Sequence, residues 1–591
     1  MSGGMSGGTR YRDCTRRLLI LALDGASPEL IERWASEGRL PHLRRLMEEG
    51  AFGPLESVIP PVTGAAWGSF LTGLSPGRHG VCEWLRRRPH SYALEPVDGS
   101  ALPSPTLLEW LSAHGQRVGV VSLPLTYPFR FRDRGGGGGG FAVGDLLTPP
   151  GRPYTHPPSL QRELEEALGG RYPLAPPPWP GGRRAAGWFS RLQRSLELRA
   201  RAILYLAARK DWDVFLAHVM ETDSVQHQMW HTLDRHPRPR YGSPLPDEEP
   251  VLEVYRRADA LVGELRSLLD ERDTLWVISD HGFGPHRYNL HLNTWLLRQG
   301  FLRLRGNLPT RVKRALYELG VVPENLYPWE ARLGLLGRGS GDPAQAYRWL
   351  SRFALSTANV DWSRTVAYSY GNVGQIFLNR RGREPQGIVP PRCAPKILEE
   401  VEEALREWRN PWTGEPVVER LFRAEELYGP ERHPQSPDLV FLPAEGHSPM
   451  GLSEFLSNRP VTHAVAHSGW HRLYGVFLGC GAGLPRGRVR LRLLDLFPTI
   501  CELLGVPPPP GLDGRASEAL RARHPVGSAS TSETLDGGRT AAQDQGPGDF
   551  GADAEEGLSA LEGSRSGSEG SPLSPEEEEE IRERLRGLGY L

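Results

Sequence analysis

The sequence predicts an α/β fold with a mostly parallel central sheet flanked by helices. Its apolar residues gather in short continuous runs, which are typical of strands buried on both faces of a parallel sheet. Segments with apolar residues at helical spacing lie between these runs, and such alternation favours parallel pairing. The expected strands are residues 18–23, 118–123, 212–219 and 275–279, and the expected helices are 107–113, 192–208 and 254–269.

The composition is that of a large globular protein without a dominant charge. The chain has 591 residues, and its 70 Lys and Arg residues against 71 Asp and Glu residues give a formal net charge of -1. This balance provides no overall field that would attract nucleic acid or an anionic membrane. The five cysteines form no CxxC pair, and no run approaches the roughly 18 apolar residues of a membrane-spanning helix. We therefore expect a cytoplasmic protein without nucleic-acid or membrane partners.

Composition also divides the chain into four expected regions. A polar stretch rich in Gly and Ser near the C-terminus cannot bury enough apolar surface to fold. After it, Ser574-Pro575 and a run of five glutamates resemble an N-cap, a proline at the first helical position and an acidic first turn. The expected regions are a disordered tail (1–16), one large domain (17–515) with a helical insertion at about 302–360, a disordered linker (516–573) and a C-terminal helix (574–591).

Acidic side chains follow three of the expected strands. Asp24 comes directly after the first strand, and Asp280-His281 closes another. Asp223 follows a third, with His227 four residues later, which on a helical turn places both on one face. Each motif alone is more often a turn or a solvated helix face, but active sites in such sheets lie beyond the carboxyl ends of the strands. Aspartate and histidine without cysteine favour zinc or manganese, and the two clusters indicate two divalent ions.

Thr63 is a candidate nucleophile. It follows Pro60-Pro61-Val62 and precedes three small residues. Local sequence supports two roles equally, a helix N-cap and a catalytic hydroxyl. The roles are compatible, because a hydroxyl at a helix N-terminus beside a metal ion is partly ionised by both fields.

The motifs resemble, in order, those of the type I phosphodiesterase/nucleotide pyrophosphatase branch of the alkaline phosphatase superfamily. The resemblance spans Leu18 to about Gly514 and is strongest to a prokaryotic group within that branch; it implies an alkaline phosphatase-like fold. The motifs are Asp24-Gly25, Pro61-Val62-Thr63, Leu71-Thr72-Gly73 with Pro76-Gly77-Arg78-His79-Gly80, Asp223-Ser-Val-Gln-His227, Asp280-His281-Gly282 and Gly469-Trp470-His471.

The resemblance also implies how the site residues divide between two ions. His471 fits the last ligand position better than His467, which is the second choice, or His463. The implied ligands are Asp24, Thr63, Asp280 and His281 for one ion, and Asp223, His227 and His471 for the other.

The expected activity is hydrolysis of a small-molecule phosphoester, of the phosphodiesterase or nucleotide pyrophosphatase kind. Thr63 would form a phosphothreonine intermediate, with zinc as the first choice of metal and manganese as the second. A formylglycine sulfatase is disfavoured because its Cys-x-Pro-x-Arg signature is absent. Two alternatives stay open: a phosphomonoesterase or phosphomutase of the same superfamily, and a non-catalytic metal-binding interaction protein.

Overall fold

The computed structural model describes residues 16–130, 140–180, 185–234, 249–325, 354–450, 455–464, 467–481, 483–521 and 573–590. The expected tail (1–16) and linker (516–573) lie almost wholly outside the described residues, and so do residues 326–353 of the expected insertion. None of the described helices is long and apolar enough to cross a membrane.

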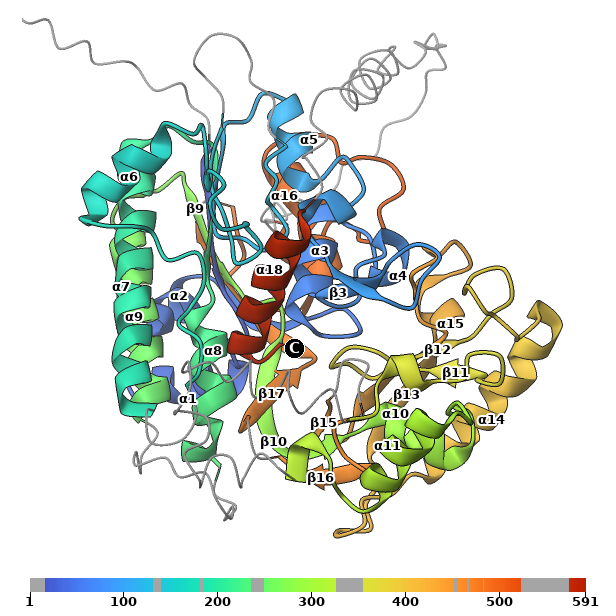
Figure 1. Ribbon diagram of the computed structural model, residues 1–591. Helices are drawn as coiled ribbons and strands as arrows, with labels where there is room; N and C mark the ends of the chain where they lie inside the picture. Colours follow the sequence, from blue (N-terminus) through green and yellow to red (C-terminus); the bar gives the residue numbers. More distant parts are fainter. Residues whose placement is uncertain are drawn as a thin grey trace, which may run out of the picture.

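A mixed sheet with mostly parallel strands forms the centre of the protein (Figure 1). In the described part of the chain it has ten strands, in the order β19-β2-β18-β9-β1-β8-β5-β6-β7 with β20 beside β2. The central strands β9, β1, β8, β5 and β6 pair in parallel, whereas β18 and β7 run antiparallel to their neighbours. The predicted α/β fold class is thereby confirmed. The bounds are β1 Leu18–Leu23, β2 Ala51–Glu56, β5 Val118–Val121, β6 Phe141–Val143, β7 Thr155–His156, β8 Val214–Val219, β9 Thr274–Ile278, β18 Tyr474–Gly481, β19 Gly487–Arg488 and β20 Leu491–Arg492.

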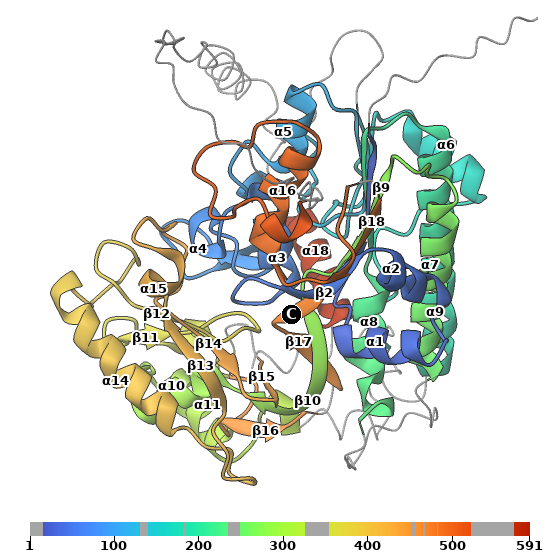
Figure 2. The same cartoon turned by 180° about the vertical axis from the view of Figure 1, so that it is seen from behind.

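Helices cover both faces of this sheet because its central strands are apolar on both sides. Alternate residues of β1 pack into two different hydrophobic cores, one on each face. Figures 1 and 2 show α6, α7 and α9 on one side and α3, α5, α16 and α18 on the other. The bounds are α1 Pro28–Ser36, α2 Pro41–Glu49, α3 Thr63–Thr72, α4 Pro76–His79, α5 Leu107–Ala113, α6 Leu160–Leu168, α7 Ala185–Arg209, α8 Glu221–Met229, α9 Glu249–Arg266, α16 Leu496–Leu503 and α18 Pro575–Leu588.

A second, smaller sheet has its own hydrophobic core. Its strands lie in the order β11-β12-β14-β13, and its core runs from Leu290 to Val461. This unit is wider than the insertion expected at 302–360, because the buried strands β12 and β14 come from sequence beyond that range. The bounds are α10 Leu292–Gln299, α11 Leu308–Glu318, β11 Ala367–Tyr368, β12 Gln375–Leu378, α14 Ala394–Glu407, β13 Val418–Arg423, α15 Ala424–Tyr428 and β14 Leu439–Pro443.

The long strand β10 connects the two units. It begins just after the end of β9 and pairs antiparallel with β17, parallel with β15 and antiparallel with β16. Its neighbour β17 thereby comes to lie beside the end of the central sheet. The bounds are β10 Gly282–Leu290, β15 Gly446–Pro449, β16 Val461–His463 and β17 Gly469–Arg472, and a separate hairpin pairs β3 Leu85–Arg87 with β4 Leu94–Pro96.

Candidate metal centre

Three neighbouring strands bring the predicted acidic residues to one edge of the central sheet. Strands β9, β1 and β8 lie side by side in parallel register. Asp24 is the first residue after β1, Asp280 comes two residues after β9, and Asp223 lies in the first turn of α8, beyond the end of β8. All three side chains are buried. Residues far apart in the sequence therefore meet because the strands before them are adjacent.

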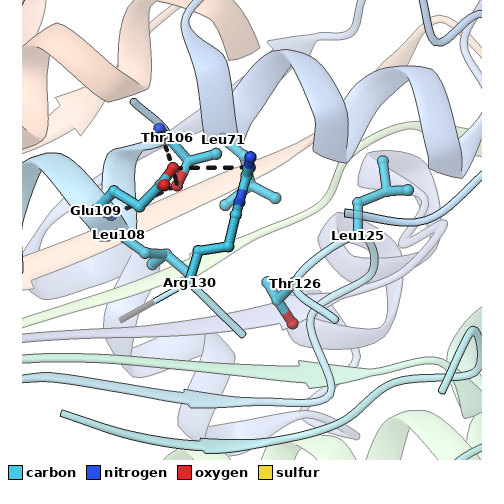
Figure 3. A pocket seen from close by; sticks show the side chains of 7 residues that line it. All are labelled: Leu71, Thr106, Leu108, Glu109, Leu125, Thr126 and Arg130. Carbon is cyan, nitrogen blue, oxygen red and sulfur yellow. Dashed lines mark hydrogen bonds and ion pairs between the residues drawn. The ribbon is translucent and has the colours of Figure 1, made fainter. Parts of the chain in front are cut away.

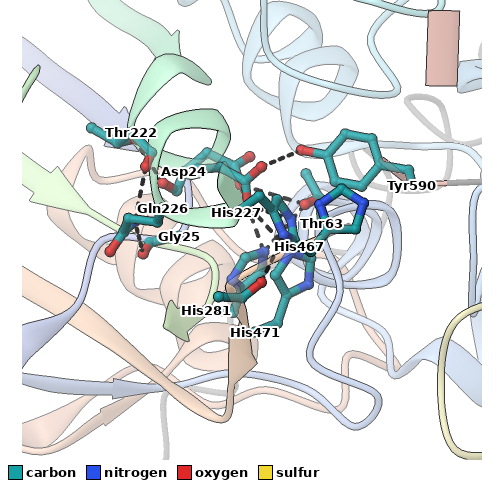
Figure 4. Close-up of polar contacts among 12 residues, drawn as sticks. Asp24, Gly25, Thr63, Thr222, Gln226, His227, His281, His467, His471 and Tyr590 are labelled. Carbon is teal, nitrogen blue, oxygen red and sulfur yellow. Dashed lines mark hydrogen bonds and ion pairs between the residues drawn. The ribbon is translucent and has the colours of Figure 1, made fainter. Parts of the chain in front are cut away.

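Asp223, His227 and His471 form the first group of candidate ligands. Figure 4 shows the side chains of His227 and His471 close to those of Asp24, Thr63 and His281. The Nε2 atoms of the two histidines are 3.0 Å apart, and they lie 3.4 and 3.2 Å from Oδ1 of Asp223. His227 stands one helical turn after Asp223 on α8, whereas His471 comes from β17.

Asp24, Asp280 and His281 form the second group, with Thr63 beside it. Nε2 of His281 lies 3.3 Å from Oδ2 of Asp280 and 3.6 Å from Oδ1 of Asp24. The Thr63 hydroxyl is 3.4 Å from Oδ1 of Asp24 and 3.2 Å from Nε2 of His281. The two groups adjoin, since the rings of His281 and His471 stack with their centroids 3.8 Å apart.

The donors in both groups fit divalent ions. Metal bonds of about 2.0–2.1 Å in a tetrahedral site separate neighbouring ligand atoms by roughly 3.3 Å, close to the separations found here. Among the described residues, neither Oδ1 of Asp223 nor Oδ2 of Asp280 has a hydrogen-bond partner, and both atoms are buried. Such burial is costly for a carboxylate unless a cation lies against it. Burial and the charge of Asp24 raise the pKa of Asp280, a strain that a divalent ion would relieve. Imidazole and carboxylate donors suit zinc or manganese.

Backbone carbonyls orient two of the histidines within the candidate ligand groups. Nδ1 of His227 is 3.1 Å from the carbonyl oxygen of Gly469, and Nδ1 of His281 is 3.1 Å from that of Gly282. Because a carbonyl oxygen only accepts, Nδ1 carries the proton in each ring and Nε2 keeps a lone pair. Burial also lowers the pKa of His227, which favours the neutral ring that binds metal.

Two side-chain donors hold the outer oxygen of Asp24, which is the oxygen that faces away from the other candidate ligands. Its Oδ2 accepts hydrogen bonds from Nε2 of His218, at 2.7 Å, and from Nε1 of Trp67, at 3.2 Å. His218 is the fifth residue of β8 and Trp67 lies on α3. The two donors leave Oδ1, the other oxygen, facing Thr63 and His281.

The other two carboxylates are held in the same way. Oδ1 of Asp280 accepts from the backbone N–H of Gly25, at 3.2 Å, and Oδ2 of Asp223 accepts from the Tyr590 hydroxyl, at 2.5 Å. Neither Tyr590 nor His218 was predicted from the sequence. Neither residue lies in a recognisable motif. The nearest signal for Tyr590 is the apolar stripe that Ile581, Leu585 and Leu588 form on the C-terminal helix before it, which predicts that this helix docks on the rest of the protein.

Thr63 is the first residue of α3, and Val62 occupies the N-cap position. The Thr63 side chain is fully buried and its hydroxyl faces the second group instead of capping the helix. The partial positive charge of the helix N-terminus acts on the same hydroxyl.

A pocket opens beside the two groups, lined by residues of both units and of the C-terminus. It contains about 480 Å³ of empty space, part of it open to solvent. Val62 and His471 line it from the side of the centre, Phe441 from β14, and Tyr590 from the end of the chain. Most of its lining is apolar, with the Glu83 carboxylate as an acidic exception.

A different pocket, shown in Figure 3, contains about 290 Å³ of empty space and lies near the start of α5. Its two charged residues, Glu109 and Arg130, pair with each other at 3.6 Å. None of the predicted site residues lines it.

The other histidines that the sequence raised as candidates lie outside both groups. His467 is buried beside α8, with Nδ1 3.2 Å from Nε2 of Gln228. His463 is exposed on β16. His79, at the end of α4, is buried beside α3, where it contacts Ser69.

Fold and family together identify a metal-dependent phosphoric ester hydrolase. The chain belongs to the type I phosphodiesterase/nucleotide pyrophosphatase family, whose pattern matches residues 18–469. The resemblance drawn from the motifs is thereby confirmed.

Solved structures similar to this chain include phosphonoacetate hydrolase from Sinorhizobium meliloti 1021, in complex with phosphonoformate or with phosphonoacetate. The phosphonoformate complex is 18% identical, with 83% of this chain and 95% of that chain covered and a TM-score of 0.48. The phosphonoacetate complex has the same identity and coverage with a TM-score of 0.47. Human ectonucleotide pyrophosphatase/phosphodiesterase 5 is 13% identical, with 84% and 97% covered and a TM-score of 0.45. Comparison with curated protein sequences found no match.

Proposed function

We propose that the protein hydrolyses phosphodiesters with Thr63 as nucleophile and two divalent ions bound at the two Asp/His groups. The observation that carries this proposal is the position of the Thr63 hydroxyl, 3.2–3.4 Å from two members of the second group and at a helix N-terminus. Asp24, Thr63, Asp280 and His281 would hold one ion, and Asp223, His227 and His471 the other. Zinc is the first choice and manganese the second, because both accept mixed imidazole and carboxylate donors.

The reaction would proceed in two in-line displacements at phosphorus. Two bound ions would supply charge stabilisation for the attacking and leaving oxygens. In the first step Thr63 Oγ1 forms a bond to phosphorus while the bond to the leaving oxygen breaks; the hydroxyl proton passes through solvent to the leaving oxygen, so that a phosphothreonine and a free alcohol result. In the second step water attacks the same phosphorus, the bond to Oγ1 breaks, and Thr63 regains its proton.

The lining of the pocket favours a diester over a monoester. A monoester dianion carries one more negative charge than a diester, and an enzyme for it needs extra positive charge around the non-bridging oxygens. The pocket instead presents apolar side chains together with the Glu83 carboxylate. Such a surface suits the second organic substituent of a diester, which must leave water on binding.

The test compares kcat/KM for bis-p-nitrophenyl phosphate and p-nitrophenyl phosphate on one zinc- or manganese-loaded preparation, with Thr63→Ala as the contamination control. We expect the diester to be preferred and both activities to vanish in the variant. A Thr63-dependent preference for the monoester would assign the protein to the phosphatase or phosphomutase side, and product analysis would separate those two. Two bound ions without turnover on any phosphate, phosphonate or sulfate ester would favour a non-catalytic interaction protein.

A further inference from the structure

The end of the chain reaches into the candidate metal centre. Tyr590 is 367 positions away from Asp223 in the sequence, and its hydroxyl donates to Oδ2 of that carboxylate at 2.5 Å. Figure 4 shows the Tyr590 side chain pointing toward the other residues of the centre. We propose that Tyr590 is a positioning residue for the Asp223–His227–His471 group, so that docking of the C-terminal helix and binding of an ion there stabilise one another.

The three carboxylates of the centre support this role by comparison. In each, one oxygen faces the ion position and the other accepts a hydrogen bond from a protein donor. For Asp24 the donors lie on β8 and α3, and for Asp280 the donor lies in the loop after β1. For Oδ2 of Asp223, Tyr590 is the one hydrogen-bond donor among the described residues. Without that bond the carboxylate would be free to rotate, and Oδ1 would no longer be held toward the two histidines.

The ring of Tyr590 is enclosed as tightly as its hydroxyl. The residue is 3% exposed, and its ring centroid lies 5.8 Å from that of His227 and 5.6 Å from that of Trp84. Its carbonyl oxygen accepts from Nδ2 of Asn372 at 2.8 Å. Contacts to both units of the protein therefore fix the position of this residue.

The residue before Tyr590 has to be glycine for two reasons. Gly589 has φ +94°, a conformation that side chains disfavour. A Cβ there would also lie 2.1 Å from Cε1 of His467, well inside van der Waals contact. The backbone consequently passes close against the segment that leads to β17 and His471.

Specific contacts seat the helix α18 itself. Ile581 and Leu585 are fully buried in the core that also contains α3. Glu577 pairs with Arg152 through both carboxylate oxygens, at 2.5 and 2.6 Å. Arg584 donates to the carbonyl oxygen of Thr148 at 2.9 Å.

Along the chain, residues 522–572 separate this helix from the preceding elements of the unit that contains the central sheet. The entropy of closing so long a connection changes only slowly with its length, so the noncovalent contacts decide whether α18 is docked. A contact between the docked helix and an ion ligand couples the two equilibria, and such coupling is reciprocal. Removing the partner of an ion ligand typically costs about 10–100-fold in ion affinity.

The inference rests on the two-ion site of the proposed function and not on the ester that is cleaved. The first experiment measures zinc affinity of the full-length protein by competition with a chelator, for wild type, Tyr590→Phe and Tyr317→Phe. Tyr317 is the matched control, because its hydroxyl is also buried and hydrogen-bonded, to Thr294 and to the carbonyl of Ser457, but in the other unit. We expect Tyr590→Phe to weaken one of the two zinc sites about 10–100-fold and Tyr317→Phe to weaken neither.

A second experiment measures hydrogen exchange of the α18 amides with and without zinc, first in wild type, where no variant has to fold, and then in Tyr590→Phe. We expect zinc to slow exchange in wild type and to do so by a smaller factor in Tyr590→Phe. The proposal would be overturned if wild type and Tyr590→Phe bound zinc with equal affinity. It would also be overturned if zinc did not change the rate of amide exchange in α18 of wild type. Faster ester turnover by Tyr590→Phe at unchanged zinc affinity would overturn it too, since Tyr590 would then obstruct the site. If both results are as expected and no ester is cleaved, the proposed function fails while the coupling stands.

Discussion

Nε2 of His218 lies 2.7 Å from Oδ2 of Asp24, between neighbouring strands of the central sheet. The register of β1 against β8 places His218 opposite Ala22, two residues before Asp24. Both side chains are almost fully buried. A buried imidazole that donates to the carboxylate oxygen facing away from the candidate ion position fixes the orientation of that ligand and favours its ionised form.

Replacing His218 should therefore lower the affinity for the ion that Asp24 would hold. We expect His218→Leu to lower zinc affinity at one site about 10–100-fold, as measured by competition with a chelator. His218→Gln, which keeps an N–H donor of similar reach, should lose less. Equal losses in the two variants would show that packing, not the hydrogen bond, sets the affinity.

Thr63→Ala should abolish turnover and largely preserve ion binding. The hydroxyl would be the nucleophile, but only one ligand among several, so we expect kcat to fall on the order of 10³-fold or more with both zinc ions retained. Thr63→Ser keeps a hydroxyl and should keep measurable activity. Steady-state kinetics and zinc content on the same samples check this. Near wild-type activity in Thr63→Ala would exclude covalent catalysis by this residue.

Asp280→Asn should lose metal together with activity. The amide oxygen can still accept from Gly25, but it brings no charge to neutralise a cation. We expect about one zinc ion fewer per chain after dialysis, measured by elemental analysis, and partial recovery of activity when zinc is added in excess. Full zinc content after dialysis would contradict the ligand role of Asp280.

The buried His79 should lower the free energy of unfolding at mildly acidic pH. Burial lowers the pKa of His79 from 6.5 to about 3. Its Nδ1 accepts from the backbone N–H of Val81, so a second ring proton would meet a donor. The unfolded chain protonates this ring below about pH 6.5 and the folded protein does not, so stability present above that pH is lost as the pH falls toward 3.

The measurement is urea unfolding of metal-free wild type and His79→Gln at pH 7 and pH 5. We expect the stability of wild type relative to the variant to drop by about 2 kcal/mol between the two pH values. A difference that does not change with pH would mean that His79 has an ordinary pKa in the folded protein.

The sequence alone was enough to determine the fold class and the family. Runs such as 18–23 are apolar at every position, and a strand of that kind is stable only between two layers of helices. The order of short motifs at strand ends was enough to indicate the family, which the match over residues 18–469 confirms. These features are local, and hydrophobic periodicity and turn chemistry report local structure directly.

The candidate ligands were predicted partly from local sequence and partly from the family resemblance. Asp24, Asp223 and Asp280 were named because each follows a strand, and the adjacency of β9, β1 and β8 brings them together. Their role as ligands stays a prediction. His471 depended on the family resemblance, since nothing in its local sequence shows that β17 pairs with β10.

Only the tertiary structure decided which groups hold the outer oxygens of the carboxylates. His218 looks like any polar residue in a strand, and its use depends on the register of β8 against β1. Tyr590 reaches Asp223 because the apolar stripe of α18 docks on the core beside α3. The stripe predicts that the helix docks, but not where. A contact between positions 367 apart is fixed by the packing of whole elements, which is a property of the folded chain rather than of any segment of it.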